Sequence, residues 1–152
     1  MQCLICVNIQ DKFVNEIEDA NEIIPIVNEL LTKFNLVIFT LEPPNFYEES
    51  LYPLIHKDIK IENIWGDFYF FKDHDHLNIP SFLMKKNVTD VFVCGLPLDT
   101  YIVKVALNMK AYFNTIVIED ATKSFNPNIN ETLKSFKKDG IKLVESWELS
   151  QL

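Results

Sequence analysis

Short apolar runs separated by segments of helical periodicity are the feature that most constrains the fold of this chain. The runs, such as LVIF, VFVC and TIVI, are continuously apolar, which is typical of parallel strands buried on both faces. The predicted strands cover residues 3–8, 36–41, 68–71, 91–94, 115–119 and, more weakly, 141–145. The sequence therefore predicts an α/β fold, a three-layer α/β/α sandwich around a mostly parallel sheet of roughly six strands.

Amphipathic helices are predicted between most of these strands. Ile23, Val27 and Leu30 recur at the spacing that places side chains on one helix face. The predicted helices cover residues 21–34, 80–86, 99–112 and 129–138, with Asp99 or Thr100 as the cap of the third. Ligands of such sheets bind beyond the carboxyl ends of the strands. Candidate site residues should therefore be Asn8, Lys72 and residues 41–45, 95–101 and 120–122.

The size and charge of the chain exclude several classes of protein. Its 152 residues suit a single domain spanning residues 1–152. The net charge of −8 has the wrong sign for binding nucleic acid, and no apolar run approaches the roughly 20 residues of a membrane span. The N-terminus shows no basic, apolar targeting segment, so we expect a cytoplasmic protein without a membrane partner.

The positions of the glycines and cysteines exclude two nucleotide-binding motifs and predict the state of the thiols. Gly66, Gly95 and Gly140 are the only glycines, and their spacing excludes both the P-loop and the dinucleotide-binding fingerprint. Cys3, Cys6 and Cys94 lie inside apolar runs, which predicts reduced, buried thiols, with Cys3 and Cys6 on opposite faces of one strand.

A resemblance to a known family is visible in residues 91–111, VFVCGLPLDTYIVKVALNMKA. The segment resembles the nucleophile region of the isochorismatase-like hydrolases, the superfamily of nicotinamidases and isochorismatases. Three further stretches resemble the family in the same order: CLICVNIQDKFV matches its first strand through Gln10 and Phe13, DFYFFK carries Lys72 at its lysine, and TIVIEDATKS matches its fifth strand. The resemblance spans nearly the whole chain.

The resemblance implies a catalytic triad of aspartate, lysine and cysteine, from which this sequence departs. The aligned positions hold Asn8, Lys72 and Tyr101. An amide cannot act as the base, and a phenol with a reference pKa of about 10 is protonated at neutral pH. We therefore expect a catalytically inactive homologue that acts in binding, regulation or assembly. Two alternatives remain open: a hydrolase of a small amide or ether that uses Lys72, Tyr101 and Asp99, and a pocket that binds a small aromatic or carboxylate ligand without turnover.

The resemblance implies a metal site, but this sequence does not carry its ligand residues. TLEPPN places Glu42 and Pro44 where nicotinamidases carry an aspartate and a histidine. His74, Asp75 and His76 form a separate polar group, which we interpret as a solvated turn. No metal or other cofactor is expected.

Further expectations concern the geometry of the site. The side chains of Asn8, Lys72 and Tyr101 should converge at the carboxyl edge of the sheet, with the tyrosine ring in the substrate's volume. Residues of the turn before Tyr101 are expected to contact substrate, namely Leu96, Pro97 and Asp99. The Leu96–Pro97 bond should be cis, as the family's turn is, because proline lowers the preference for trans.

Aromatic residues at the crevice edge could contact an aromatic ligand: Phe46, Tyr47 and residues 68–71. The protein could also be a homo-oligomer.

Overall fold

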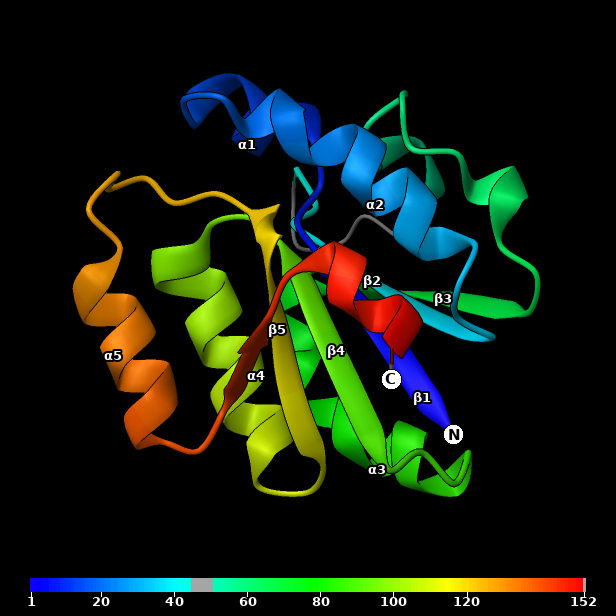
Figure 1. Ribbon diagram of the computed structural model, residues 1–152. Coiled ribbons are helices and arrows are strands. Elements are labelled where there is room, and N and C mark those ends of the chain that lie inside the picture. Colours follow the sequence, from blue (N-terminus) through cyan, green and yellow to red (C-terminus); the bar gives the residue numbers. More distant parts are fainter. Residues whose placement is uncertain (45–50, 152) are drawn as a thin grey trace.

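The computed structural model describes residues 1–44 and 51–151. Asn45, Phe46 and Tyr47, which belong to the predicted crevice, lie outside the described residues. Six parallel strands form one sheet in the order β3-β2-β1-β4-β5-β6 (Figure 1). The strands are β1 Gln2–Val7, β2 Leu36–Leu41, β3 Asp67–Lys72, β4 Asp90–Gly95, β5 Asn114–Thr122 and β6 Lys142–Val144. The predicted three-layer α/β/α fold is confirmed.

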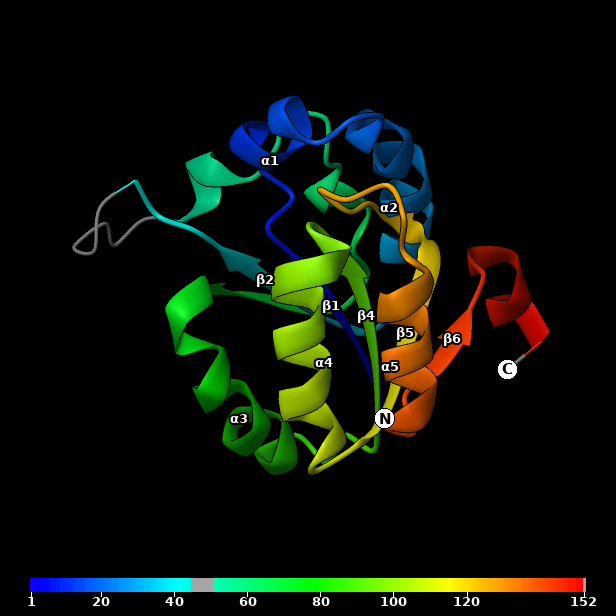
Figure 2. The same ribbon diagram turned by 90° about the vertical axis from the view of Figure 1, so that its left-hand side faces the viewer.

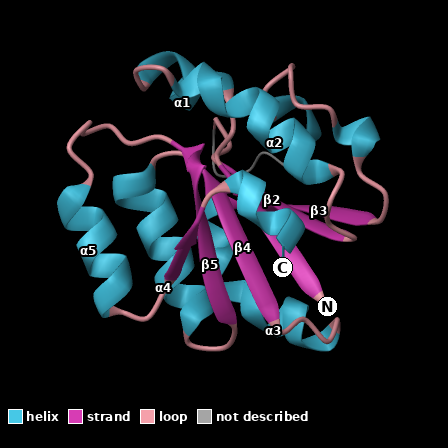
Figure 3. Ribbon diagram, in the orientation of Figure 1, coloured by secondary structure: helices cyan, strands magenta, loops and turns pink. Residues whose placement is uncertain are grey.

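Helices cover both faces of the sheet (Figures 1, 2 and 3). The helices are α1 Asp11–Glu16, α2 Ile23–Leu31, α3 Ile79–Lys85, α4 Val103–Lys110 and α5 Asn130–Lys138. One core cluster joins the sheet to α1 and α2, and a second joins its other face to α3, α4 and α5. Among the helices of the described part of the chain, none has the length and apolar character that crossing a bilayer requires.

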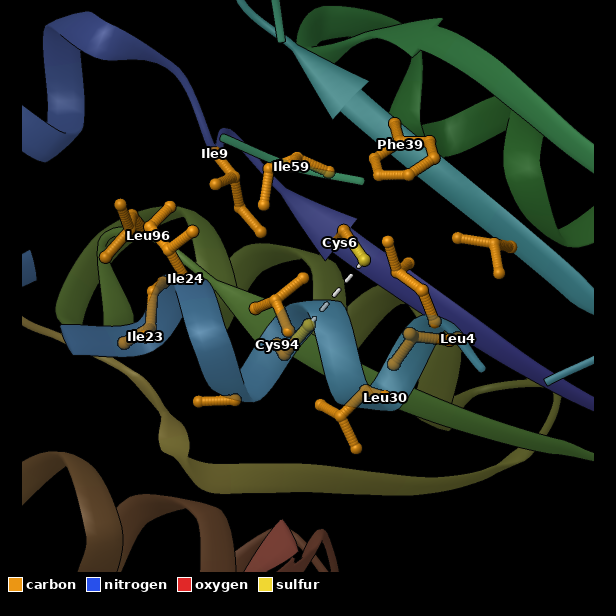
Figure 4. Close-up of a cluster of buried hydrophobic side chains, with 14 of the residues drawn as sticks. Leu4, Cys6, Ile9, Ile23, Ile24, Leu30, Phe39, Ile59, Cys94 and Leu96 are labelled. Atoms are coloured by element: carbon orange, nitrogen blue, oxygen red, sulfur yellow. Dashed lines mark hydrogen bonds between the residues drawn. The ribbon is translucent and has the colours of Figure 1, made fainter. Parts of the chain in front are cut away.

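The cysteines belong to these cores, as predicted. Cys6 and Cys94 lie in the first cluster and Cys3 in the second, so Cys3 and Cys6 do point to opposite faces. All three are free and buried, and burial raises the pKa of the Cys3 and Cys6 thiols. The Sγ atoms of Cys6 and Cys94 are 3.7 Å apart on neighbouring strands (Figure 4). Cys94 has no exposed surface and lies within the first core cluster, so the structure supports a packing role for it.

The turn after β4 differs in part from its prediction. The Leu96–Pro97 peptide bond is cis, which confirms the prediction. The predicted cap is wrong, because Leu98–Ile102 forms a π-helical turn before α4 and neither Asp99 nor Thr100 caps the helix. The Asp99 carboxylate instead accepts hydrogen bonds from the backbone N–H groups of Phe125 and Asn126, both at 3.2 Å.

One helix and the end of one strand also differ from their predictions. Helix α1 was not predicted, because its six residues bury only Phe13 and show no apolar periodicity. Strand β5 continues to Thr122, beyond the predicted end at Glu119. The carboxylates of Glu119 and Asp120 are only partly buried, so the strand can pass through them without removing them from water. The register between β4 and β5 shifts after Val93, so that Gly95 pairs with Thr122.

Candidate functional site

Asn8 directly follows β1 and is completely buried. Its φ of 50° lies in the left-handed region, which asparagine tolerates better than most residues. Its backbone N–H donates to the carbonyl of Thr40 at 2.8 Å. Within the part of the chain that the structure describes, neither Oδ1 nor Nδ2 has a hydrogen-bond partner. Because an unpaired buried polar group costs about 1–3 kcal/mol, this amide is a candidate for pairing with a ligand.

Gln10 joins the loops that follow β1 and β2. Its Nε2 donates to the backbone carbonyl of Glu42 at 2.8 Å, and its Oε1 accepts from the backbone N–H of Glu42 at 2.7 Å. The Glu42 carboxylate also pairs with Lys12 Nζ at 2.8 Å. The resemblance aligned Gln10 but gave it no role. This double hydrogen bond shows that it positions Glu42 at the edge of the site.

Lys72 ends β3, opposite Leu41 in the register with β2. Because the strands are parallel, Lys72 and Asn8 lie at the same edge of the sheet, with β2 between their strands. The side chain of the next residue, Asp73, is largely buried, and its pKa is raised by burial and then by the nearby Glu42 carboxylate. The ends of β2 and β3 therefore present two carboxyl groups close to each other.

Tyr101 lies in the π-helical turn and packs against both core clusters. Its ring meets that of Phe13 edge-on, with centroids 6.0 Å apart, and Lys104 Nζ lies 5.3 Å from its centroid. Burial raises the pKa of the Tyr101 phenol, and the negative charges of Glu42 and Asp73 raise it further. The hydroxyl group thus lies near the carboxyl ends of β2 and β3 and stays protonated at neutral pH.

This raised pKa has a testable consequence in an absorbance titration of the phenol groups. We expect the titration of the wild type minus that of Tyr101→Phe to give a midpoint above the reference pKa of about 10. A raised folded-state pKa means that the contribution of Tyr101 to stability is complete below pH 10 and is lost as pH rises through the folded pKa. A midpoint below 10 would show that Tyr101 is activated rather than suppressed as a nucleophile.

The residues predicted to contact substrate are engaged in the fold. The Leu96 side chain is fully buried, and its N–H donates to the carbonyl of Val7 at 2.9 Å. Pro97 has no N–H, and the Leu98 N–H donates to the carbonyl of Lys123 at 2.8 Å. Because Asp99 binds backbone N–H groups, its carboxylate is also occupied. Contact of Leu96, Pro97 and Asp99 with a substrate stays a prediction.

The polar turn around His74 follows β3 as a 3₁₀ helix, Asp73–Asn78. His74 lies between the carboxylates of Asp73 and Asp75, at 3.8 and 3.7 Å. Burial lowers the pKa of His76, as does the positive charge of Lys104. The described residues contain no group of three or more His, Cys, Asp or Glu side chains placed to hold a metal ion.

A cavity of about 480 Å³ lies at the carboxyl end of β5, in the region where residues 120–122 were predicted to be informative. Its polar lining is mainly acidic: Glu18, Asp19, Glu22, Glu119, Asp120 and Glu145. Its apolar lining includes Leu98, whereas Asn8, Lys72 and Tyr101 do not contribute. Burial raises the pKa of Glu145, and Asp120 and Glu119 raise it further. This cavity is distinct from the aligned triad positions and disfavours anionic ligands.

Comparison with solved structures identifies the fold. The chain aligns over 97% of its length with 97% of a nicotinamidase/pyrazinamidase from Acinetobacter baumanii, at a TM-score of 0.77 and 21% identity. It aligns over 99% of its length with 94% of an isochorismatase-like hydrolase from Alkaliphilus metalliredigens, at a TM-score of 0.77 and 13% identity. It aligns over 97% of its length with 93% of PnC1 from L. infantum, solved with nicotinate, at a TM-score of 0.80 and 15% identity. The chain therefore has the isochorismatase-like hydrolase fold.

One nicotinamidase sequence is similar to part of this chain. A nicotinamidase from Schizosaccharomyces pombe is 31% identical over 81 residues, which make up 53% of this chain and 36% of that protein. The matched segment thus spans about a third of the length of this curated relative. No protein-family profile matches the chain. The fold and this match together confirm the resemblance to the isochorismatase-like hydrolases that the motifs indicated.

Proposed function

We propose that this protein is a catalytically inactive isochorismatase-like homologue that binds a small, neutral aromatic ligand at the carboxyl edge of its sheet. The observation that carries the proposal is the buried, unpartnered amide of Asn8 at the position of the family's catalytic aspartate. An amide can donate and accept hydrogen bonds but cannot take a proton from a nucleophile. The position is therefore suited to recognition and not to base catalysis.

Tyr101 supports inactivity at the position of the family's nucleophile. A reactive phenol requires a lowered pKa or an adjacent base. The pKa of Tyr101 is raised instead, because burial and the negative charges of Glu42 and Asp73 outweigh the opposing charge of Lys12. A phenolate there would be repelled by both carboxylates.

The rival function is a hydrolase that uses Lys72, Tyr101 and Asp99. The hydrogen bonds from Phe125 and Asn126 hold the Asp99 carboxylate against the loop after β5. Asp99 could serve Tyr101 as a base only by leaving these contacts. The geometry therefore favours the binding protein over the alternative hydrolase.

The neutrality of the ligand follows from the charges around the site. Glu42 and Asp73 lie near the Tyr101 hydroxyl. Because Lys12 balances the charge of Glu42 at 2.8 Å, Asp73 is the carboxyl group that disfavours a carboxylate ligand. A primary carboxamide would match the donor and acceptor of the Asn8 side chain. Aromatic surface would suit the half-buried Tyr101 ring and the adjacent Phe13.

Thermal denaturation with nicotinamide and with nicotinate tests this proposal. Nicotinamide should raise the melting temperature and should be recovered unchanged. At a hundredfold excess over Kd, binding would add about 2.7 kcal/mol to the free energy of unfolding. Asn8→Gly keeps the left-handed backbone but removes the amide, so it should abolish the shift. Asn87→Gly is the matched control, because exposed Asn87 has a similar φ of 61°. Equal shifts in both variants, or none in the wild type, would contradict ligand recognition by Asn8.

A further inference from the structure

Strand β3 is an edge strand of the sheet that the described strands form. Among the described strands β3 pairs only with β2, in a register that runs without interruption from Asp67 to Lys72. Its six residues, DFYFFK, contain no proline and no bulge. The opposite edge is protected in a usual way, because β6 has only three residues and begins with Lys142. Because no described strand lies on the outer side of residues 68–71, the backbone N–H and C=O groups there can pair with another strand.

Aromatic side chains cover both faces of this edge. On one face Phe68, which is 37% exposed, lies 5.8 Å from Phe70, and Tyr52, which is 58% exposed, lies 5.9 Å from Phe70. On the other face the rings of Tyr69 and Phe71 pack on Phe82, at 4.9 and 5.5 Å. A half-exposed aromatic strand edge of this kind marks an interaction surface.

A positive and a negative side chain, Lys86 and Asp67, lie next to this edge, so two copies of the edge can place opposite charges against each other. Lys86 Nζ donates to the Tyr69 hydroxyl at 3.2 Å and lies over the Tyr69 ring. Asp67 is exposed and lies two residues from Tyr69, so both side chains point to the same face. A second β3 strand running antiparallel would carry the same pair in the opposite order along the edge.

We propose that β3 pairs antiparallel with β3 of a second copy of this chain across a two-fold axis. Such an axis requires opposing residues to lie on the same face, which allows a register centred on Tyr69 or on Phe70. The Phe70 register would set Asp67 opposite residue 73 of the other copy, which lies beyond the end of β3, so Asp67 would face no strand residue. The Tyr69 register sets Phe68 against Phe70 of the other copy. It also brings Asp67 towards the Lys86 that lies on the opposing Tyr69, so the interface uses this register.

Charge exchange between Asp67 and Lys86 tests the proposal by sedimentation velocity. The wild type should sediment as a dimer. Asp67→Lys and Lys86→Asp should each weaken dimerisation at least about tenfold, because each sets two pairs of like charges across the interface. An equimolar mixture of the two variants should recover dimers, since every contact in the heterodimer again joins opposite charges. Glu131→Lys on α5 is the control, because Glu131 is exposed far along the chain from this edge and its change should have no effect.

Folding of the variants is checked by circular dichroism. If Lys86→Asp fails to fold, Asp67→Lys/Lys86→Gln replaces it and should dimerise more tightly than Asp67→Lys alone. A monomeric wild type would overturn the proposal, as would single variants that dimerise like the wild type. A mixture of folded, monomeric variants that stays monomeric would also overturn it.

Discussion

Replacing Gly95 by alanine is expected to destabilise the protein by roughly 2–6 kcal/mol, the sum of backbone strain and overpacking. A Cβ atom at Gly95 would lie 2.1 Å from the Val7 carbonyl oxygen and 2.6 Å from the Val7 nitrogen, both backbone atoms of the neighbouring strand. The φ of +118° adds strain for any other residue. Because Gly95 leads directly into the turn that carries Tyr101, its loss should also disrupt the site.

Denaturant unfolding measures this effect, with Gly140→Ala as the matched control. Gly140 also has a positive φ, +77°, but the nearest atom to its added Cβ would be Lys110 Cε at 3.8 Å. The control should therefore lose only about 1 kcal/mol, the cost of the left-handed backbone. Equal losses in the two variants would contradict the close approach of β4 to β1 at Gly95.

Restoring the family's two missing groups together is expected to create amide hydrolysis. Tyr101→Cys alone should remain at background, because a thiol without a base at position 8 stays mostly protonated. Asn8→Asp/Tyr101→Cys should exceed the single variant by about 10²- to 10⁴-fold, the usual contribution of a positioned base. Ammonia release from nicotinamide is the measurement.

Asn8→Asp alone is the control for this experiment, since it supplies the base without the thiol. If Tyr101→Cys alone is as active as the double variant, position 8 does not serve the thiol, and the predicted convergence of Asn8, Lys72 and Tyr101 is wrong. If the double variant is folded and inactive, the family pocket itself has been lost.

The fold could be predicted because its signals are local. Continuous apolar runs such as LVIF identified the buried parallel strands, and the motif around Gly95 identified the cis turn. Helix α1 was not predicted, because it buries only one side chain, Phe13, and so shows no apolar periodicity. Tertiary contacts, and not local sequence, decide such short elements.

The motifs proposed Asn8, Lys72 and Tyr101 as site positions, and this remains a prediction. The hydrogen bonds of Gln10 to Glu42 could not be predicted, because they join residues 32 positions apart. No sequence signal announced them. Likewise, Asp99 had the local pattern of a helix cap, and only the return of the chain after β5 supplies the backbone N–H groups that it binds.

Ammonia release by the unmodified protein is the most direct test of the proposed inactivity. Purified protein is incubated with nicotinamide beside an active nicotinamidase and a buffer blank. We predict that the protein releases no more ammonia than the blank, because the positions that the resemblance aligns with the family's nucleophile and base hold the Tyr101 phenol, whose pKa is raised, and the Asn8 amide. Release above the blank that is lost in Tyr101→Phe or Lys72→Ala would contradict the proposal and establish a hydrolase with a different catalytic set.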